Sequence, residues 1–310
     1  MSTTFIVWLT LCLIWGSTWI FIKLGLRDLP PITFAGLRFL FASVILWAIV
    51  FARRRPLPKN RGDWLKLAWA GSISFALNYS LVFWGEQHIN SGLAAVLQAM
   101  IPAFGLIFAH IHLPNERITA RKLAGAGVGV AGVSLIFYDQ MKIEGAAALQ
   151  GCVALVLSSI CVAYTNVFVK ARCQHIDSSV IAAGQMVWAV PPLLVVASVW
   201  EGNPFDHHWS RQSALSLAYL TLIGSVLAFL LYFWLVAKIE ITKTMLIALV
   251  TPVTALLIGK LTLDERLSWR IAAGSAAILV GIWLIVFQRR ANRLEDSLRF
   301  DDDQTNKLRK

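Results

Sequence analysis

The chain has 310 residues, of which 57% are hydrophobic and only 15% are charged, and its formal net charge is +11. Because a soluble domain has about 25% charged residues, this composition argues against a water-soluble globular protein. The basic residues gather between long apolar runs, so the positive charge indicates orientation in a membrane and not a nucleic-acid partner.

The chain contains ten apolar runs, each long enough to cross a bilayer as an α-helix, which takes roughly 17–25 residues. Lipid offers no partner to free backbone N–H and C=O groups, so we expect helices, and the runs lack the short alternation of barrel strands. In chain order the runs cover residues 5–25, 31–51, 64–85, 91–111, 119–137, 150–170, 178–200, 213–236, 243–262 and 268–288.

The loops that join these runs differ in their basic residues. The loop after the second run carries Arg53, Arg54 and Arg55, whereas "EQHIN" (86–90) carries none, although the last loop on that side is basic. Because basic loops stay in the cytoplasm, we expect both the N-terminus and the C-terminus to be cytoplasmic. Residues 289–310 form a charged tail that we expect to be disordered.

The second half of the chain repeats the first. Residues 83–132 align with 233–281, and "TWIFIK" (18–23) aligns with "TNVFVK" (165–170), which sets Arg38 opposite Gln185. In the longer alignment the matched pairs are Phe83/Phe233, Trp84/Trp234, Pro102/Pro252, Gly125/Gly274 and Gly132/Gly281.

Each half contains five of the expected helices. An odd number of spans makes the second half enter the membrane in the opposite sense, and such inverted repeats are typical of secondary transporters with a substrate site near the bilayer midplane. The expected fold is therefore an all-α integral membrane protein with ten transmembrane helices in two inverted five-helix repeats. The repeats cover residues 1–138 and 139–288, and the tail covers 289–310.

Several motifs are similar to those of a known family. They are "WGSTWIFIK" (15–23), "LRFLFA" (37–42) and the duplicated blocks "PAFGLIFAHIHLPNERIT" and "PVTALLIGKLTLDERLS". Over about residues 5–288 the chain resembles the drug/metabolite transporter superfamily, specifically its EamA-type ten-helix branch. This resemblance implies export or exchange of small metabolites, often amino acids, across a bacterial inner membrane. The segment "NYSLVFWGEQHINSG" (78–92) is more polar than the family pattern, which suggests a role with this protein's own substrate.

Polar and aromatic side chains recur inside the apolar runs. On a helical wheel Trp15, Thr18 and Trp19 share a face, which we expect to meet a cavity and not lipid. In the outer half of the membrane the expected substrate-binding residues are Thr18, Trp19, Arg38, Asn78, Tyr79 and Gln98. In the inner half they are Thr165, Asn166, Gln185 and Tyr232, and further aromatic lining is expected from Trp15 and Trp188. Alternatively, the polar members only bond helix to helix, at roughly 0.6–2 kcal/mol each.

Arg38 is the only clear candidate for a charge deep in the membrane. Such a charge costs about 2.5 kcal/mol or more unless it meets water or a partner. A guanidinium presents five donors in a fork that suits a carboxylate. Arg38 could therefore bind a substrate carboxylate, pair with Glu86 at the outer mouth, or serve as a structural anchor.

Proline and glycine also occupy matching places. Pro102 and Pro252 lie in mid-helix, where proline removes a backbone hydrogen bond and kinks the helix, so they could act as hinges or give the cavity a fixed shape. Gly125 and Gly129 form a GxxxG pattern, which lets helices approach closely. We expect this face to pack on the last apolar run, and a homodimer contact is the alternative.

The sequence holds no GxxxxGK[ST], GxSxG or HExxH motif, so we expect no ATPase or other enzyme activity, no cofactor and no metal site. The predicted function is a secondary transporter, an exporter or exchanger of small metabolites such as amino acids, working by alternating access through a central cavity. Alternatives are transport of a nucleotide sugar, an organic phosphate or a cationic drug, or a receptor or scaffold role without transport. The expected partners of the monomer or homodimer are a small-molecule substrate and the lipid bilayer.

Overall fold

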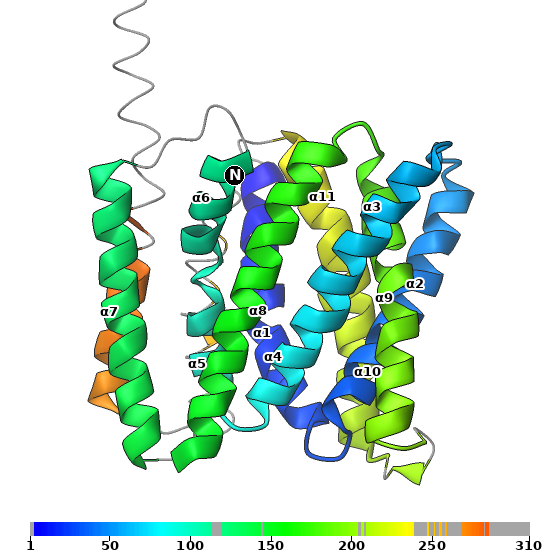
Figure 1. Ribbon diagram of the computed structural model, residues 1–310. Helices are drawn as coiled ribbons and strands as arrows, with labels where there is room; N and C mark the ends of the chain where they lie inside the picture. The colour runs from blue at the N-terminus through cyan, green and yellow to red at the C-terminus, as the bar shows by residue number, and fades with distance from the viewer. Residues whose placement is uncertain are drawn as a thin grey trace, which may run out of the picture.

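The computed structural model describes residues 3–112, 119–143, 145–203, 206–207, 209–238 and 268–281, together with 247, 251, 254–255, 258 and 283–284. All regular secondary structure in these residues is helical (Figure 1). Most of the expected run 243–262 and the whole tail 289–310 lie outside the described residues.

Seven helical stretches in the described part of the chain are long and apolar enough to span a membrane. They are Thr3–Gly25, Pro31–Ala52, Arg61–Glu86, Ser91–His112, Gly145–Arg172, Ser178–Trp200 and Arg211–Tyr232. The continuous helices among them are α1 (Thr3–Gly25), α2 (Pro31–Ala52), α8 (Gly145–Arg172) and α9 (Ser178–Trp200). Two further helices, α7 (Ala120–Ile143) and Trp269–Gly281, coincide with the expected runs 119–137 and 268–288.

The stretch 91–112 is broken at its centre. It consists of α5 (Ser91–Gln98) and α6 (Ile101–His112), with Pro102 in the first turn of α6. Because proline has no N–H to donate and disfavours a helical residue before it, the hydrogen-bond ladder restarts here. The sequence predicted a kink at Pro102, and the structure has a complete break just before it; the matching Pro252 lies outside the described residues.

Two other spans each contain a six-residue π-helical segment at mid-length. The first span is α3 (Arg61–Gly71), η1 (Ser72–Leu77) and α4 (Asn78–Glu86), and the second is α10 (Arg211–Thr221), η3 (Leu222–Leu227) and α11 (Ala228–Lys238). Leu222 follows Ser72 by 150 residues, and Phe233 follows Phe83 by the same number. π segments are rare and often lie at functional sites, so both segments are candidates for the functional centre.

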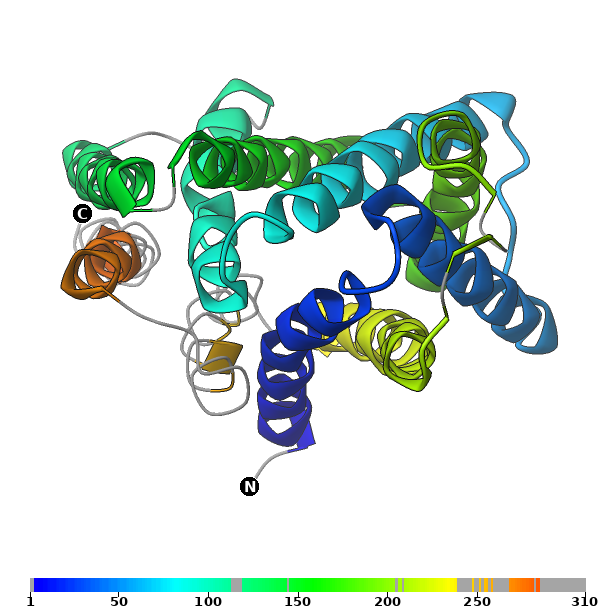
Figure 2. The same cartoon turned by 90° about the horizontal axis from the view of Figure 1, so that it is seen from below.

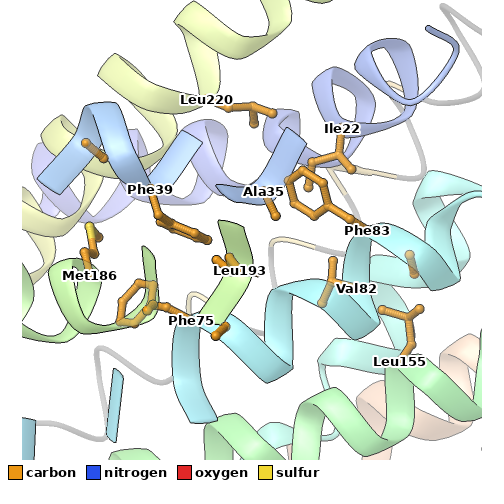
Figure 3. Close-up of a cluster of buried hydrophobic side chains, with 14 of the residues drawn as sticks. Ile22, Ala35, Phe39, Phe75, Val82, Phe83, Leu155, Met186, Leu193 and Leu220 are labelled. Carbon is orange, nitrogen blue, oxygen red and sulfur yellow. The ribbon is translucent and has the colours of Figure 1, made fainter. Parts of the chain in front are cut away.

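The helices pack so that distant parts of the chain meet. α2 lies along α9, which also packs on α3 and η1, while α4 and α6 pack on α8, and α1 packs on α10 and α11. Seen from below, α3–α4 and α8 form one side of the bundle and α1 with α10–α11 the opposite side (Figure 2). In the apolar core, Phe39 and Phe75 meet at 5.2 Å between ring centroids, beside Met186 of α9 (Figure 3).

α7 and the helix Trp269–Gly281 lie side by side at one edge of the bundle (Figures 1 and 2). A Cβ on Gly132 would lie 2.5 Å from the carbonyl oxygen of Gly274, and a Cβ on Gly281 would lie 2.8 Å from the amide nitrogen of Gly129 and collide with Gly125. Only glycines allow so close an approach. The expected packing of this glycine face on the last apolar run is therefore confirmed.

Candidate functional site

Arg38 lies in α2 with only 2% of its surface exposed. Its Nε donates a hydrogen bond to the Ser225 hydroxyl at 2.9 Å, and its Nη2 donates to the Gly224 carbonyl at 3.4 Å. Both acceptors belong to the π segment η3. A cation of the first half of the chain is thus held by an irregular segment of the second half.

Three aromatic rings surround the same guanidinium. Its carbon lies 5.0 Å from the ring centroid of Tyr79, 5.2 Å from that of Phe39 and 6.0 Å from that of Phe83. A cation within about 6 Å of a ring centroid is attracted by the negative ring face. The Tyr79 hydroxyl and the Glu86 carboxylate also act on its charge, so these groups replace part of the water that Arg38 gives up.

The polar groups around Arg38 are incompletely paired. Among the residues that the structure describes, Nη1 of Arg38 and Oδ1 of Asn78 are buried with no hydrogen-bond partner. Asn78 uses its amide nitrogen to donate to the Ser74 carbonyl at 2.9 Å, in the π segment η1. Since buried polar groups are nearly always satisfied, the open donor of Arg38 indicates a site that something else completes.

A line of aromatic rings crosses from α11 to α4. Trp15 lies 5.3 Å from Tyr232 and 6.0 Å from Phe229, measured between ring centroids. Phe229 lies 5.5 Å from Phe75, and Phe75 lies 6.0 Å from Tyr79. We call these five residues the aromatic line. It joins two of the expected site residues, Trp15 and Tyr232, to the surroundings of Arg38.

Other expected site residues have their polar atoms bound within the protein. The Thr18 hydroxyl donates to the Trp15 carbonyl at 2.8 Å, and the Thr165 hydroxyl donates to the Cys161 carbonyl at 2.9 Å. Gln98 donates to the Ser158 hydroxyl and so ties α5 to α8. Trp19 is half-buried against the main apolar core. Only the Gln98 contact matches the helix-to-helix alternative, because the Thr18 and Thr165 hydroxyls bond to carbonyls of their own helices.

The remaining expected residues lie apart from Arg38. Gln185 of α9 is buried, and its backbone touches Gly71 so closely that a Cβ at residue 71 would collide with it. Asn166 of α8 is exposed, and Trp188 of α9 is 43% exposed. The structure therefore brings the expected outer residue Arg38 together with Tyr79 and, on either side of Gly224, with Thr18.

Sequence reasoning missed Gly224, Ser225, Phe75 and Phe229. Small or apolar residues inside an apolar run carry no signal by themselves. The repeat did carry one, because Phe229 follows Tyr79 by the same 150 residues that separate Phe83 from Phe233. Within the described residues, no group of three or more His, Cys, Asp or Glu side chains could hold a metal ion.

This architecture defines a multi-pass α-helical membrane protein with a buried cation between distant helices. The model of the EamA-like transporter family matches residues 3–138 and again residues 149–287. The chain therefore belongs to the EamA-like transporter family and is a membrane transporter.

Curated relatives and a solved structure agree with this assignment. "Uncharacterized transporter YoaV" of Bacillus subtilis is 30% identical over 90% of this chain and 95% of its own length. The "Uncharacterized inner membrane transporter YedA" of Escherichia coli K12 is 30% identical over 83% of this chain and 82% of its own length. The "Probable amino-acid metabolite efflux pump" of the same strain is 27% identical over 91% of this chain and 94% of its own length. A crystal structure of another protein has a TM-score of 0.65 at 20% identity, covers 95% of this chain and 99% of its own, and supports the fold. The protein is accordingly a multi-pass protein of a bacterial membrane.

Proposed function

We propose that the protein is a secondary transporter that exports or exchanges small metabolites such as amino acids by alternating access between its two halves. The observation that carries this proposal is the buried Arg38 of the first half, bound by Ser225 and Gly224 of the second half. A pathway between two halves must be lined by residues of both, and the aromatic line continues that pairing through Trp15 and Phe229.

The proposal includes ten membrane helices in two inverted repeats, with both termini in the cytoplasm. Paired contacts support the repeats. The Ser17 hydroxyl meets the Tyr219 hydroxyl at 2.6 Å, and the Trp69 indole nitrogen donates to the Tyr164 hydroxyl at 3.3 Å. Tyr164 follows Ser17 by 147 residues, which is also the offset between Thr18 and Thr165. Tyr219 follows Trp69 by 150 residues, which is also the offset between Phe83 and Phe233. One contact is thus the counterpart of the other.

The glycine contacts of α7 support the repeats in the same way. The alignment pairs Gly132 with Gly281 and Gly125 with Gly274. The contact of Gly132 with Gly274 is therefore the counterpart of the contact of Gly281 with Gly125. Two contacts that exchange under the alignment are what a two-fold relation between inverted halves requires.

An amino-acid-like substrate is supported by the mixture of groups along the proposed pathway. Trp15 and Tyr232 offer aromatic surface, while Arg38, Asn78 and Tyr79 offer charge and hydrogen bonds. The Escherichia coli relative named as a probable amino-acid metabolite efflux pump supports the same substrate class.

Counterflow in proteoliposomes tests transport without knowledge of the coupling ion. Vesicles are preloaded with mixed amino acids, and each labelled amino acid is then added outside and compared with protein-free vesicles. We expect one or more labels to accumulate, and we expect Trp15→Ala to slow accumulation at least tenfold. Trp200→Ala is the matched control, because Trp200 is 77% exposed at the end of α9 and should transport normally. Failure of every label to accumulate with folded, inserted protein would reject amino acids as substrates.

A further inference from the structure

The guanidinium of Arg38 has two hydrogen-bonding edges, and the structure uses only one. The side edge, formed by Nε and Nη2, donates to Ser225 and Gly224. The end edge, formed by Nη1 and the second hydrogen of Nη2, points to no acceptor, since Nη1 is without a hydrogen-bond partner among the described residues. The arginine is therefore oriented by one half of the chain while its other edge stays available.

An open edge on a charged group this deeply buried is unusual. Arg38 is 2% exposed, so water does not satisfy Nη1, and leaving a charged donor unpaired is more costly than leaving a neutral one. Position 38 is matched in the second half by Gln185, which is neutral, so only one end of the proposed pathway carries this charge. The buried Glu86 carboxylate acts on this charge, so Arg38 is not a lone cation, but the unfilled end edge keeps hydrogen-bonding capacity for one carboxylate.

The geometry of the end edge selects the kind of anion. Two parallel N–H groups on a planar guanidinium fit the two oxygens of a carboxylate, and such bidentate pairs are stronger and more directional than single contacts. The ring of Tyr79 lies 5.0 Å from the guanidinium carbon, and its hydroxyl is a further hydrogen-bond donor close to Arg38. A doubly charged phosphate would keep one charge uncompensated against a single buried cation.

The surroundings of the edge select the rest of the ligand. Phe39, Phe83 and Tyr79 lie within 6.0 Å of the guanidinium carbon, and Phe75 lies 6.0 Å from Tyr79 between ring centroids. These rings favour an apolar or aromatic body next to the charged end. A large polar group such as a sugar would lose its hydration here without recovering hydrogen bonds.

We propose that the end edge of Arg38, with the Tyr79 hydroxyl, binds the carboxylate of the transported solute, and that the solute is an amphipathic monocarboxylate whose apolar body lies along the aromatic line. This inference rests on the proposed transport function. Because Ser225 holds the other edge of the same guanidinium, solute binding and the contact between the halves act on one side chain.

Binding of matched acid and amide probes tests the proposal. Purified protein in lipid nanodiscs is titrated calorimetrically with L-phenylalanine, L-leucine and 3-phenylpropionate, and each acid is compared with its own carboxamide. We expect the wild type to bind at least one acid ten times more tightly than the corresponding amide. Arg38→Gln should abolish this preference, and Arg38→Lys should keep only a part of it because lysine has no planar fork.

Two further variants separate recognition from folding. Tyr79→Phe keeps the ring beside Arg38 and removes only the hydroxyl, so the acid preference should fall a few-fold while the thermal midpoint stays near that of the wild type. Arg211→Gln is the matched control, because this arginine is exposed at the start of α10, and the full preference should remain.

Three outcomes overturn the proposal: equal binding of acid and amide by the wild type, no binding of any of the three acids, or an unchanged acid preference in folded Arg38→Gln protein. If replacing chloride by sulfate stabilises the wild type but not Arg38→Gln, and none of the three acids binds, the site is one for inorganic anions.

Counterflow keeps the two proposals distinct. Transport that survives with an unchanged acid preference in Arg38→Gln leaves the transporter proposal standing and removes the carboxylate site. Acid binding that depends on Arg38, in protein that shows no counterflow, leaves the carboxylate site standing and removes the transporter proposal.

Discussion

Gly71 permits the contact between α3 and α9, and replacing it by alanine should loosen that contact. A Cβ at this position would lie 2.9 Å from both the Cα and the carbonyl carbon of Gln185, whereas ordinary van der Waals contacts are 3.4–4 Å. The carbonyl oxygen of Gln185 lies closer still, so a Cβ would collide with it and the helices must separate. Overpacking of this kind costs about 1–3 kcal/mol, and the better helix propensity of alanine returns about 1 kcal/mol. Because the obstructing atoms are backbone, we expect a net loss of about 1–2 kcal/mol.

Thermal unfolding of the purified protein in one detergent measures this loss. A change of 1 kcal/mol shifts the midpoint of a domain of this size class by about 2–4 °C, so Gly71→Ala should lower it by about 2–8 °C. Gly127→Ala is the matched control, since nothing lies within 4 Å of a Cβ there, and its midpoint should be unchanged or slightly raised. Equal midpoints for the two variants would refute the close approach of α3 and α9.

The remaining predictions concern two other links between distant segments. In a double-mutant cycle, Ser17→Ala and Tyr219→Phe should show a coupling of about 0.6–1.7 kcal/mol in unfolding, because their hydroxyls meet at 2.6 Å, and a coupling near zero would contradict the contact. The Glu201 carboxylate accepts hydrogen bonds from the amides of Ile32 and Thr33 at 2.9 and 2.6 Å and so caps α2. Glu201→Ala should lower the free energy of unfolding by about 0.5–2 kcal/mol and speed hydrogen exchange in the first turn of α2. Glu201→Gln keeps one acceptor, so it should lose less stability. Unchanged hydrogen exchange in the alanine variant would count against the cap.

The outline of the fold followed from hydropathy. Each membrane-length stretch in the described part of the chain coincides with an expected run, because lipid forces an apolar segment to satisfy its own backbone as a helix. Irregular backbone was not predictable in the same way. The π segments read "SISFAL" and "LIGSVL" and keep the apolar pattern of an ordinary helix, so only the hydrogen-bond register reveals them. The break before Pro102 was partly predictable, since proline marks its place but not its extent.

The candidate site was predictable where a residue contrasted with its surroundings. Arg38 stood out because a charge in an apolar run needs a reason, and Trp15 and Tyr232 because large aromatic residues favour interfaces or cavities. Ser225 and Gly224 gave no such contrast. Their contact with Arg38 depends on packing between segments that lie 187 and 186 residues apart in the chain. Thr165 is buried and Asn166 is exposed, because adjacent helical residues point about 100° apart, so the two do not share one face of α8.

The glycine contacts of α7 have a consequence for biosynthesis. Gly125 and Gly132 are made about 150 residues before Gly281 and Gly274, the residues that cover them. During translation the glycine face of α7 must therefore stay uncovered by its partner until the helix Trp269–Gly281 has been made. Contacts of such long sequence separation form late, so this edge of the bundle is the last to assemble, and a nascent chain stopped before residue 268 should present α7 to the cell's membrane quality control as an unpaired helix.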